Sequence, residues 1–539
     1  MPLQSPVTAD SRITSVVPRP IHLETDEGPG CILTPASRIM GGADLAQAVH
    51  RVLAAATGLP LSVAEEPSQA AGITVAADPD LPEEGYTIRV AVEGVTIAAA
   101  TRRGAVWAAQ TLRQLLGPDA FLPGAPGARW ELPAVRIADA PRWGWRGCML
   151  DVGRHFMPIR RVMDLVELLS QLRINTLVLH LTEDQGWRFE TRSHPRLTEL
   201  GSWRRESINP YHGADGTPHG GFYTQTQLRH LVHFAEGLGI TVVPEIEFPG
   251  HATAALLAET SLAVPGFLPD QVRTEYGISD YVLNMSDASL RFVADVWSEV
   301  LDVFPSTYVA IGGDEAPVTQ WTSSPEIARR TKALGTTPEK LQSWFTVWLR
   351  DWLAERGRTP IGWDEVIDDG PVDGLVCAAW RPGDAAIRAV KGGMSTIVAP
   401  TSRTYLDYYQ SEDPEERYSI GSLTTLDDAI DFDPLDVVAD CTDEEKRLVL
   451  GTQFQLWSEY MDTMEEVEYM AFPRAIALAE AAWGRPDGLD PEAARARVAA
   501  HMERLEAAGV NVRPLNGPHP WQLGGNGRRR RPPKANQAW

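Results

Sequence analysis

Cysteine is scarce in this 539-residue chain, and its four cysteines are widely spaced. No two of them form a CxxC pair, so the sequence predicts neither a zinc site nor a disulfide framework. Long apolar runs are missing too: no window reaches about 18 uninterrupted apolar residues, so we expect no transmembrane helix. The first 20 residues lack the apolar core of a signal peptide. The expected compartment is therefore the cytoplasm, with secretion left open if the start site is misassigned.

Positive charge is also in short supply. Lys and Arg total 49 against 72 Asp and Glu, which gives a net charge of −23. Such a surface repels phosphate backbones and anionic lipid, so the sequence predicts no specific nucleic-acid partner and no membrane partner. A basic run near the C-terminus, Arg528–Lys534, is expected to be a solvated, disordered end. The oligomeric state is not predicted.

The first part of the chain has a mixed pattern of apolar residues. Helical periodicity predicts helices over Ala43–Thr57 and Arg102–Leu116. Alternation predicts a strand over Gly72–Ala77 and a hairpin over Tyr86–Ala100 that turns at Glu93 and Gly94. We therefore predict a leader over 1–20 and a small α+β domain over 21–140.

After this region, short apolar runs alternate with helix-period segments, which is typical of repeated βα units. The runs are Cys148–Val152, Asn175–Leu181, Thr241–Ile246, Tyr308–Ile311, Pro360–Trp363, Leu375–Trp380, Ser395–Ala399 and Gly451–Trp457. Helices are predicted between them, and two more close the region: Pro158–Arg173, Thr224–Leu238, Ala288–Val303, Pro338–Glu355, Ala385–Lys391, Leu478–Trp483 and Pro491–Ala508. Eight units predict an α/β fold, a (β/α)₈ TIM barrel over 141–515, followed by a tail over 516–539.

Reactive side chains follow every one of these runs. They are Arg154 and His155, Glu183 and Asp184, Glu247 and His251, Asp314 and Glu315, Trp363 to Glu365, Trp380 and Arg381, Tyr405 and Asp407, and Trp457 and Glu459. A TIM barrel places its chemistry at the carboxyl ends of its strands. The consistent position of these residues therefore predicts one active site there.

Adjacent carboxylates are the strongest chemical signal. Asp314 and Glu315 follow Gly312 and Gly313, which permit a sharp bend at a strand end. Two close carboxylates in a desolvated pocket separate in pKa, so that one stays ionised and the other keeps a proton for general acid catalysis. The alternative is a solvated Asp-Glu pair in a loop.

The aromatic residues at strand ends suggest the kind of ligand. Trp363, Trp380 and Trp457 would converge in a barrel and form a box for a sugar ring or a methyl group; the alternative is that they only cap the core. Tyr405 supplies a donor, and Asp407 and Glu459 supply acceptors for hydroxyl groups. Together with the guanidinium of Arg154, these groups describe a carbohydrate pocket, although each alone is equally compatible with a structural role.

A metal site is not predicted. The candidate ligands His180, Glu183, Glu245, Glu247 and His251 match no standard spacing. A more economical role for His251 is to orient a carboxylate and pass protons. We accordingly expect no metal and no cofactor.

Several segments, taken together, resemble the β-N-acetylhexosaminidases of glycoside hydrolase family 20. They are LDVGRHFMP, LVLHLTEDQGWRFE, VVPEIEFPGHATA, AIGGDEAP, IGWDE, TYLDYY and LWSE, in that order from about 140 to 485. The first 140 residues also resemble the small domain that precedes the barrel in that family. The resemblance implies exo-acting, retaining, substrate-assisted catalysis, in which the 2-acetamido group of the sugar is the nucleophile.

The resemblance also implies a division of roles. Glu315 would be the general acid and base, and Asp314 would orient the acetamido N–H and stabilise its positive charge. Tyr405 would donate to the acetamido carbonyl, and His251 would set the proton affinity of Glu315 together with a carboxylate after the second strand. The implied substrate contacts are the indole box for the acetamido methyl and ring face, and Arg154, Asp407 and Glu459 for the sugar hydroxyls. The expected substrates are small amino-sugar oligosaccharides, such as chitin fragments, with a terminal β-linked GlcNAc or GalNAc.

Two departures from the family leave questions open. The family usually has Asp-Asp-Gln after the second strand, and this chain has Glu183, Asp184 and Gln185, so either acidic residue could be the partner of His251. Asp184 is accordingly also a candidate substrate contact. In the loop 413–433, only Tyr418 and Phe432 are available to stack on a second sugar.

Two other functions remain open from the residues alone. One is an ordinary retaining β-glycosidase with Glu459 or Glu365 as the nucleophile. The other is a carbohydrate-binding relative that has lost catalysis, which the intact Asp314-Glu315 pair disfavours.

Overall fold

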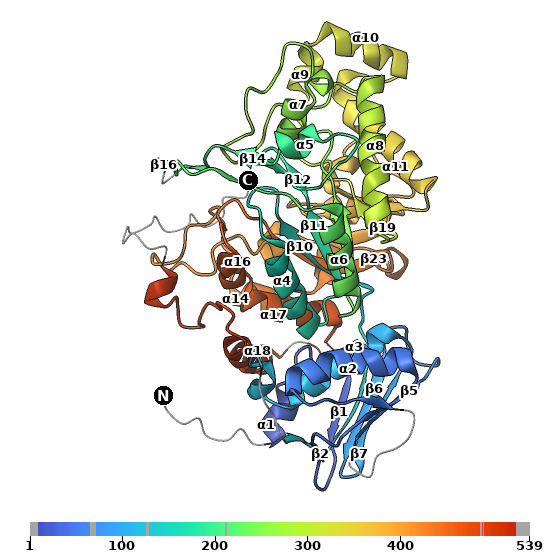
Figure 1. Ribbon diagram of the computed structural model, residues 1–539. Helices are drawn as coiled ribbons and strands as arrows, with labels where there is room; N and C mark the ends of the chain where they lie inside the picture. Colours follow the sequence, from blue (N-terminus) through green and yellow to red (C-terminus); the bar gives the residue numbers. More distant parts are fainter. Residues whose placement is uncertain are drawn as a thin grey trace.

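The computed structural model describes residues 9–64, 72–124, 129–210, 213–485, 488 and 490–523. It consists of a small domain formed by the N-terminal part of the chain and a larger barrel domain (Figure 1). The basic run Arg528–Lys534 lies outside the described residues, so its prediction stands untested. Within the described ranges, no helix has the length and apolar character needed to cross a bilayer.

The small domain is built on a seven-stranded sheet of order β1-β9-β6-β7-β5-β3-β4. The sheet strands are β1 (His22–Thr25), β3 (Ile39–Gly41), β4 (Val63–Ala64), β5 (Gly72–Ala77), β6 (Tyr86–Ala91), β7 (Gly94–Ala99) and β9 (Val135–Asp139), and β2 (Cys31–Leu33) pairs with β8 (Trp130–Leu132). Two helices, α2 (Ala43–Thr57) and α3 (Arg102–Leu115), lie side by side between this sheet and the barrel (Figure 1). The predicted helices, the strand β5 and the β6–β7 hairpin are confirmed.

The segment that precedes β1 is part of this domain. Helix α1 spans Ala9–Thr14, and the side chains of Ile13, Val16 and Val17 are buried. The side chain of Gln114 accepts from the backbone N–H of Val17 at 2.8 Å and donates to its carbonyl at 2.5 Å. Residues 13–17 thus pack against the core, although the whole of 1–20 is predicted as a leader, because a few apolar side chains in a polar segment suffice to anchor it.

The larger domain is a closed barrel of parallel strands, as predicted. In order around the barrel they are β10 (Trp145–Asp151), β11 (Thr176–His180), β18 (Thr241–Glu245), β19 (Tyr308–Ala310), β20 (Thr359–Trp363), β21 (Val376–Ala379), β22 (Thr396–Val398) and β23 (Val449–Leu456). The ring closes where β23 pairs with β10, with Trp145 opposite Gly451. The strands are apolar on both faces, because one faces the barrel interior and the other faces the helices. Each observed strand overlaps one predicted run.

Helices surround the barrel, and all seven predicted ones are present. They are α4 (Ile159–Gln171), α6 (Gln225–Glu236), α8 (Asp287–Val303), α11 (Leu341–Ala354), α12 (Ala385–Lys391), α17 (Arg474–Trp483) and α18 (Pro491–Ala507). Shorter helices that the apolar pattern did not predict are α5 (Arg196–Glu199), α7 (Thr253–Ala258), α9 (Thr319–Ser323), α10 (Pro325–Leu334), α13 (Thr401–Thr404), α14 (Leu426–Asp431), α15 (Asp443–Lys446) and α16 (Met464–Ala471). Short hairpins in the loops pair β12 (Thr182–Glu183) with β13 (Gly186–Trp187), β14 (Trp203–Arg204) with β17 (His219–Gly220), and β15 (Ile208–Asn209) with β16 (Gly213–Ala214).

The interior of the barrel is filled by side chains rather than open. Met149, Val178, Val243, Ala310 and Ile361, one from each of five strands, are buried in one cluster. The indoles of the predicted box belong to the same cluster or pack against it. The indoles at the carboxyl end of the barrel therefore rest on an apolar layer.

The two domains are joined by buried polar contacts. Arg173 pairs with Asp139 at 2.9 Å, and the indole N–H of Trp483 donates to the same carboxylate at 3.0 Å. Glu84 accepts from Arg146 and, at 2.9 Å, from the side chain of Asn175. Such contacts fix the small domain against the amino-terminal end of the barrel.

Candidate active site

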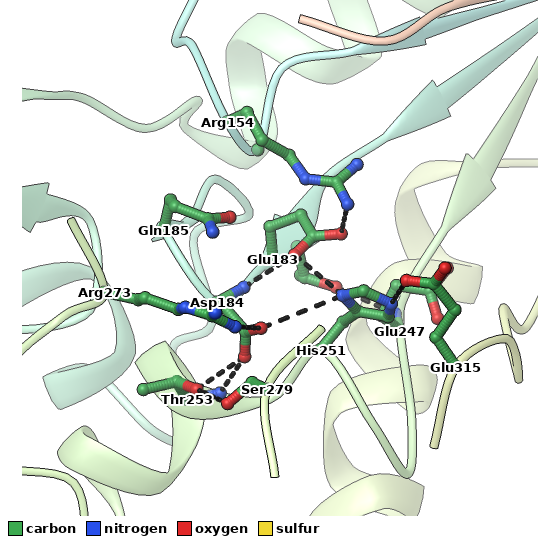
Figure 2. A network of polar contacts seen from close by, with 12 residues as sticks. Arg154, Glu183, Asp184, Gln185, Glu247, His251, Thr253, Arg273, Ser279 and Glu315 are labelled. Atoms are coloured by element: carbon green, nitrogen blue, oxygen red, sulfur yellow. Dashed lines mark hydrogen bonds and ion pairs between the residues drawn. The ribbon is translucent and has the colours of Figure 1, made fainter. Parts of the chain in front are cut away.

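The carboxyl ends of the barrel strands bring most of the predicted residues together. Arg154 follows β10, Glu183 lies on β12 after β11, and His251 follows β18. The loop after β19 carries Asp314 and Glu315. Figure 2 shows the charged part of this site, with Arg154, Glu183, His251 and Glu315 in one connected group.

The carboxylate pair lies in a sharply bent loop. Strand β19 ends at Ala310, and Gly312, Gly313 and Glu315 have φ values of 64°, 92° and 46°. A Cβ on Gly312 would lie 1.6 Å from Oε2 of Glu247, so only glycine fits there. A left-handed backbone at a residue such as Glu315 is costly and is found at sites where function requires it. The orientation of the pair is thus set by this loop and not by strand alternation.

His251 links the pair to the acidic residues after β11. Its Nδ1 lies 3.1 Å from Oε2 of Glu183, and its Nε2 lies 3.6 Å from Oε2 of Glu315 and 3.8 Å from Oδ2 of Asp314. The distance from Nδ1 to Asp184 is 3.8 Å, too long for a hydrogen bond. Of the two possible partners, Glu183 is therefore the one bonded to His251.

Asp184 has a different role from the predicted substrate contact. Its Oδ1 accepts from the backbone N–H of Thr253 at 2.9 Å and from the hydroxyl at 2.5 Å, and Arg273 pairs with Oδ2 at 3.3 Å (Figure 2). The side chain is fully buried. It holds the segment that follows His251 in place, because its carboxylate binds Thr253 and Arg273.

The surroundings divide the ionisable groups into distinct protonation states. Burial, and then the charge of Asp314, raises the pKa of Glu315. Burial raises the pKa of Glu183, but Arg154 and His251 outweigh it and hold that pKa well below the usual range. Burial lowers the pKa of His251, but Glu183 and Asp314 outweigh it and raise that pKa well above the usual value. A raised pKa helps Glu315 to keep the proton that general acid catalysis requires.

The aromatic side chains form the predicted box. The rings of Trp363 and Trp457 lie 5.8 Å apart at 41°, and those of Trp380 and Tyr405 stack at 6.0 Å and 23°. Tyr405 also lies 6.5 Å from Trp457. Strand ends five, six, seven and eight of the barrel thus supply one aromatic wall.

Polar atoms without partners face the same region. Among the described residues, Oδ1 of Asp314, Oδ1 of Asp407 and Oε2 of Glu459 are buried and have no hydrogen-bond partner. Arg154 pairs with Glu183 at 2.8 Å and lies 4.8 Å over the ring of Trp457. Buried acceptors are normally satisfied, so these carboxylates are suited to take N–H and O–H groups from a ligand.

Sequence reasoning missed the supporting residue Asp151 and one contact of Glu365. Asp151, the last residue of β10, accepts from the backbone of Gly153, Arg154 and Ser458 and so ties the first strand end to the eighth. Its position at the end of a predicted strand was the signal that could have found it. Glu365 accepts from the indole N–H of Trp380 at 3.0 Å, and no sequence pattern predicts that pairing.

Among the residues that the structure describes, two groups of side chains are close enough to share a cation, with ligand atoms within 4.8 Å of one another. They are His180 with Glu245 and Glu247, and Glu183 with Asp184 and His251. The carboxylates of Glu183 and Asp184 are already used by Arg154, Arg273 and Thr253. A metal would compete with these cations, which disfavours it; the absence of a metal and of a cofactor stays a prediction.

Comparison with known proteins agrees with this geometry. The profile described as "Glycosyl hydrolase family 20, catalytic domain" matches residues 143–486, and that of "Glycosyl hydrolase family 20, domain 2" matches residues 14–140. A beta-hexosaminidase of Porphyromonas gingivalis is 36% identical over 482 residues, covering 87% of this chain and 60% of its own length. A beta-N-acetylhexosaminidase of Cellulomonas fimi is 30% identical over 510 residues, covering 92% and 95%. The structure of an exo beta-N-acetylglucosaminidase of Vibrio harveyi with N-acetylglucosamine has a TM-score of 0.83 and 30% identity, covering 95% of this chain and 79% of its own.

Proposed function

Because the chain belongs to glycosyl hydrolase family 20, we propose that it is an exo-acting, retaining β-N-acetylhexosaminidase whose substrate supplies the nucleophile. The observation that carries this proposal is the placement of Asp314 and Glu315 next to His251, at the barrel end that also carries the indole box. The family assignment makes the chain a glycoside hydrolase; the roles of its individual residues are what we propose.

In the first step, the glycosidic C1–O bond breaks and its electron pair goes to the leaving oxygen, which takes the proton of Glu315. The carbonyl oxygen of the 2-acetamido group forms a bond to C1 and gives an oxazolinium ring. Asp314 accepts from the acetamido N–H and stabilises its positive charge, and Tyr405 donates to the carbonyl oxygen. The intramolecular attack has a high effective concentration of the nucleophile.

In the second step, water attacks C1 and gives its proton to Glu315, and the bond between C1 and the acetamido oxygen breaks. Two displacements at C1 leave the sugar with its original β configuration. The pair of Glu183 and His251 supports Glu315 in both steps, since it places an imidazole with a raised pKa 3.6 Å from the reacting carboxylate.

The alternative with an enzyme nucleophile has less support. Burial, and then the charge of Asp314, raises the pKa of Glu365 to about 8, so this group is mainly protonated at neutral pH and is a poor nucleophile. Burial also raises the pKa of Glu459. In both residues the raised pKa opposes the ionised form that a carboxylate nucleophile requires.

The substrate is a terminal β-linked GlcNAc on a small oligosaccharide such as a chitin fragment. Support comes from the box, which suits an acetamido methyl group, and from the free acceptors of Asp407 and Glu459, which suit ring hydroxyls. Action on terminal GalNAc and a cytoplasmic location also remain proposals; cell fractionation would test the second.

Turnover of two aryl glycosides tests the mechanism. We expect an aryl N-acetyl-β-glucosaminide to be cleaved at least about 10³-fold faster than the matching β-glucoside, because the glucoside has no neighbouring nucleophile. Equal rates would exclude substrate assistance. As a matched variant, Glu315→Gln should lose turnover of both yet still bind GlcNAc; unchanged turnover would show that Glu315 is not the acid and base.

A further inference from the structure

A second buried histidine lies behind the relay of Glu183 and His251. His180 is the last residue of β11 and is 1% exposed. Its Nε2 lies 3.2 Å from Oε1 of Glu183, and its Nδ1 lies 2.9 Å from Oε2 of Glu245, at the end of β18. We propose that His180 is a positioning residue that holds Glu183 ionised and in the one orientation that serves Arg154 and His251 together.

The hydrogen bonds require a doubly protonated ring. A carboxylate only accepts hydrogen bonds, so both ring nitrogens of His180 must donate if both acidic partners are ionised. The charges of Glu245 and Glu183 outweigh the effect of burial and raise the pKa of His180 well above its usual value. Two acidic hydrogen-bond partners and a raised pKa together favour the imidazolium form of His180.

The groups that face His180 come from several elements. Glu183 lies on β12, Glu245 on β18, and Asp151 on β10 adds a further negative charge. Oε1 of Glu247 lies 3.8 Å from Nδ1, and burial, and then the charge of Asp314, raises the pKa of Glu247 well above its usual value. The ring of Trp457 covers the imidazole edge-on at 5.0 Å and 78°. His180 is thus fixed on all sides by packing and charge.

The contacts of Glu183 explain why its orientation, held by His180, matters for the reaction. Its Oε1 serves both Arg154 and His180, and its Oε2 serves His251 and the backbone N–H of Asp184. Glutamate has one more rotatable bond than aspartate, so a side chain of this length needs more contacts to stay in one orientation. Arg154 and His251 contact Glu183 from the side of the proposed substrate site. His180 supplies one more contact, which further restricts the orientation of the Glu183 carboxylate.

Two substitutions separate the contacts of the ring. His180→Gln keeps an N–H near Nε2 and so the bond to Glu183, whereas His180→Asn keeps an N–H near Nδ1 and so the bond to Glu245. We expect kcat to fall about tenfold in the Gln variant and about a hundredfold in the Asn variant, since small misplacements of catalytic groups have effects of this size. Equal losses in the two variants would overturn the proposal.

The pH profile of kcat/KM distinguishes a positioning role of His180 from a role in packing alone. Both variants lose the positive charge, so the pKa of Glu183 rises, and the acid limb of kcat/KM should move up by about one pH unit. His501→Gln on α18 removes another buried histidine, which contacts Arg504 at 3.4 Å and is remote from the barrel mouth, and should leave the limb in place. An unmoved limb in the His180 variants would contradict the proposal.

The protonation state itself can be observed without turnover. In ¹⁵N-labelled full-length enzyme, the two ring nitrogens of His180, identified by their loss in the Gln variant, should both carry protons at pH 7.5. A neutral ring would overturn the inference even if activity falls. The inference rests on the proposed role of Glu315, but the two fail differently: if Glu315→Gln keeps its turnover, the proposed function fails while the spectrum of His180 stays as described.

Discussion

At the scale of single residues, the site works by giving neighbouring carboxylates different charges. Glu183 is surrounded by cations, Glu315 lies beside Asp314, and Glu365 lies in an apolar wall where it accepts from the indole N–H of Trp380. The same chemical group is therefore ionised in one place and protonated in another. A sequence identifies such carboxylates but not their charge, because the charge depends on contacts from distant strands.

The raised pKa of Glu365 should have a measurable effect on the free energy of unfolding. Its pKa is raised to about 8 in the folded protein, against about 4.3 in an unfolded chain. A carboxyl with a raised pKa favours the folded state at low pH, and this contribution is lost as pH rises from about 4.3 towards 8. Between pH 5 and pH 8, the free energy of unfolding should therefore fall less in Glu365→Gln than in the wild type, as measured by urea unfolding.

The matched control for that experiment is Glu355→Gln, at a side chain that is 77% exposed. It should reproduce the pH dependence of the wild type. If both variants gave the same curve as the wild type, Glu365 would not be a protonated group in the folded enzyme.

At the scale of elements, the loop between β19 and α9 is the most constrained segment. Gly312 combines a φ of 64° with no room for a Cβ. We expect Gly312→Ala to lower kcat/KM at least about a hundredfold, because the backbone must shift and displace the adjacent catalytic pair.

Gly335, which ends α10, supplies the control. Its φ of 73° is similar, but a Cβ there meets nothing within 4 Å. Gly335→Ala should cost about 1 kcal/mol of stability from the left-handed backbone and leave kcat/KM unchanged. Equal kinetic effects from both alanines would show that crowding against Glu247 has no catalytic importance.

Apolar periodicity was enough to predict the barrel, since each buried strand is a continuous apolar run and each longer helix has a 3.6-residue period. It missed short elements such as β1 and β3, with four and three residues, and α16, with eight. It also missed the ten-residue helix α10. The order of residues around the site followed from the rule about strand ends. The choice between Glu183 and Asp184 did not, because the tight turn between β12 and β13 sends adjacent side chains to different partners.

At the scale of the whole molecule, the small domain and the barrel share a buried polar interface. Asp139, at the end of β9, holds Arg173 of the barrel and Trp483 of α17. Removing one partner of a buried ion pair leaves an unpaired charge, which is strongly destabilising. We expect Asp139→Ala to lower the free energy of unfolding by about 3–5 kcal/mol with little change in KM, measured by denaturant unfolding and steady-state kinetics.

Glu131→Ala is the matched control, because its ion pair with Arg129 is exposed, with 61% accessibility on both side chains. Its effect on unfolding should stay below about 1 kcal/mol. If Asp139→Ala were equally mild, the interface would not be a source of stability.

The filled interior of the barrel also determines the side from which a ligand can enter and leave. Since Met149, Val178 and Ile361 fill the barrel beneath the indoles, a sugar bound among the indoles would be reached from the mouth of the barrel. In the proposed reaction, the aglycone and the freed monosaccharide would both leave through this mouth. Free monosaccharide would then compete with the next chain end for the same site.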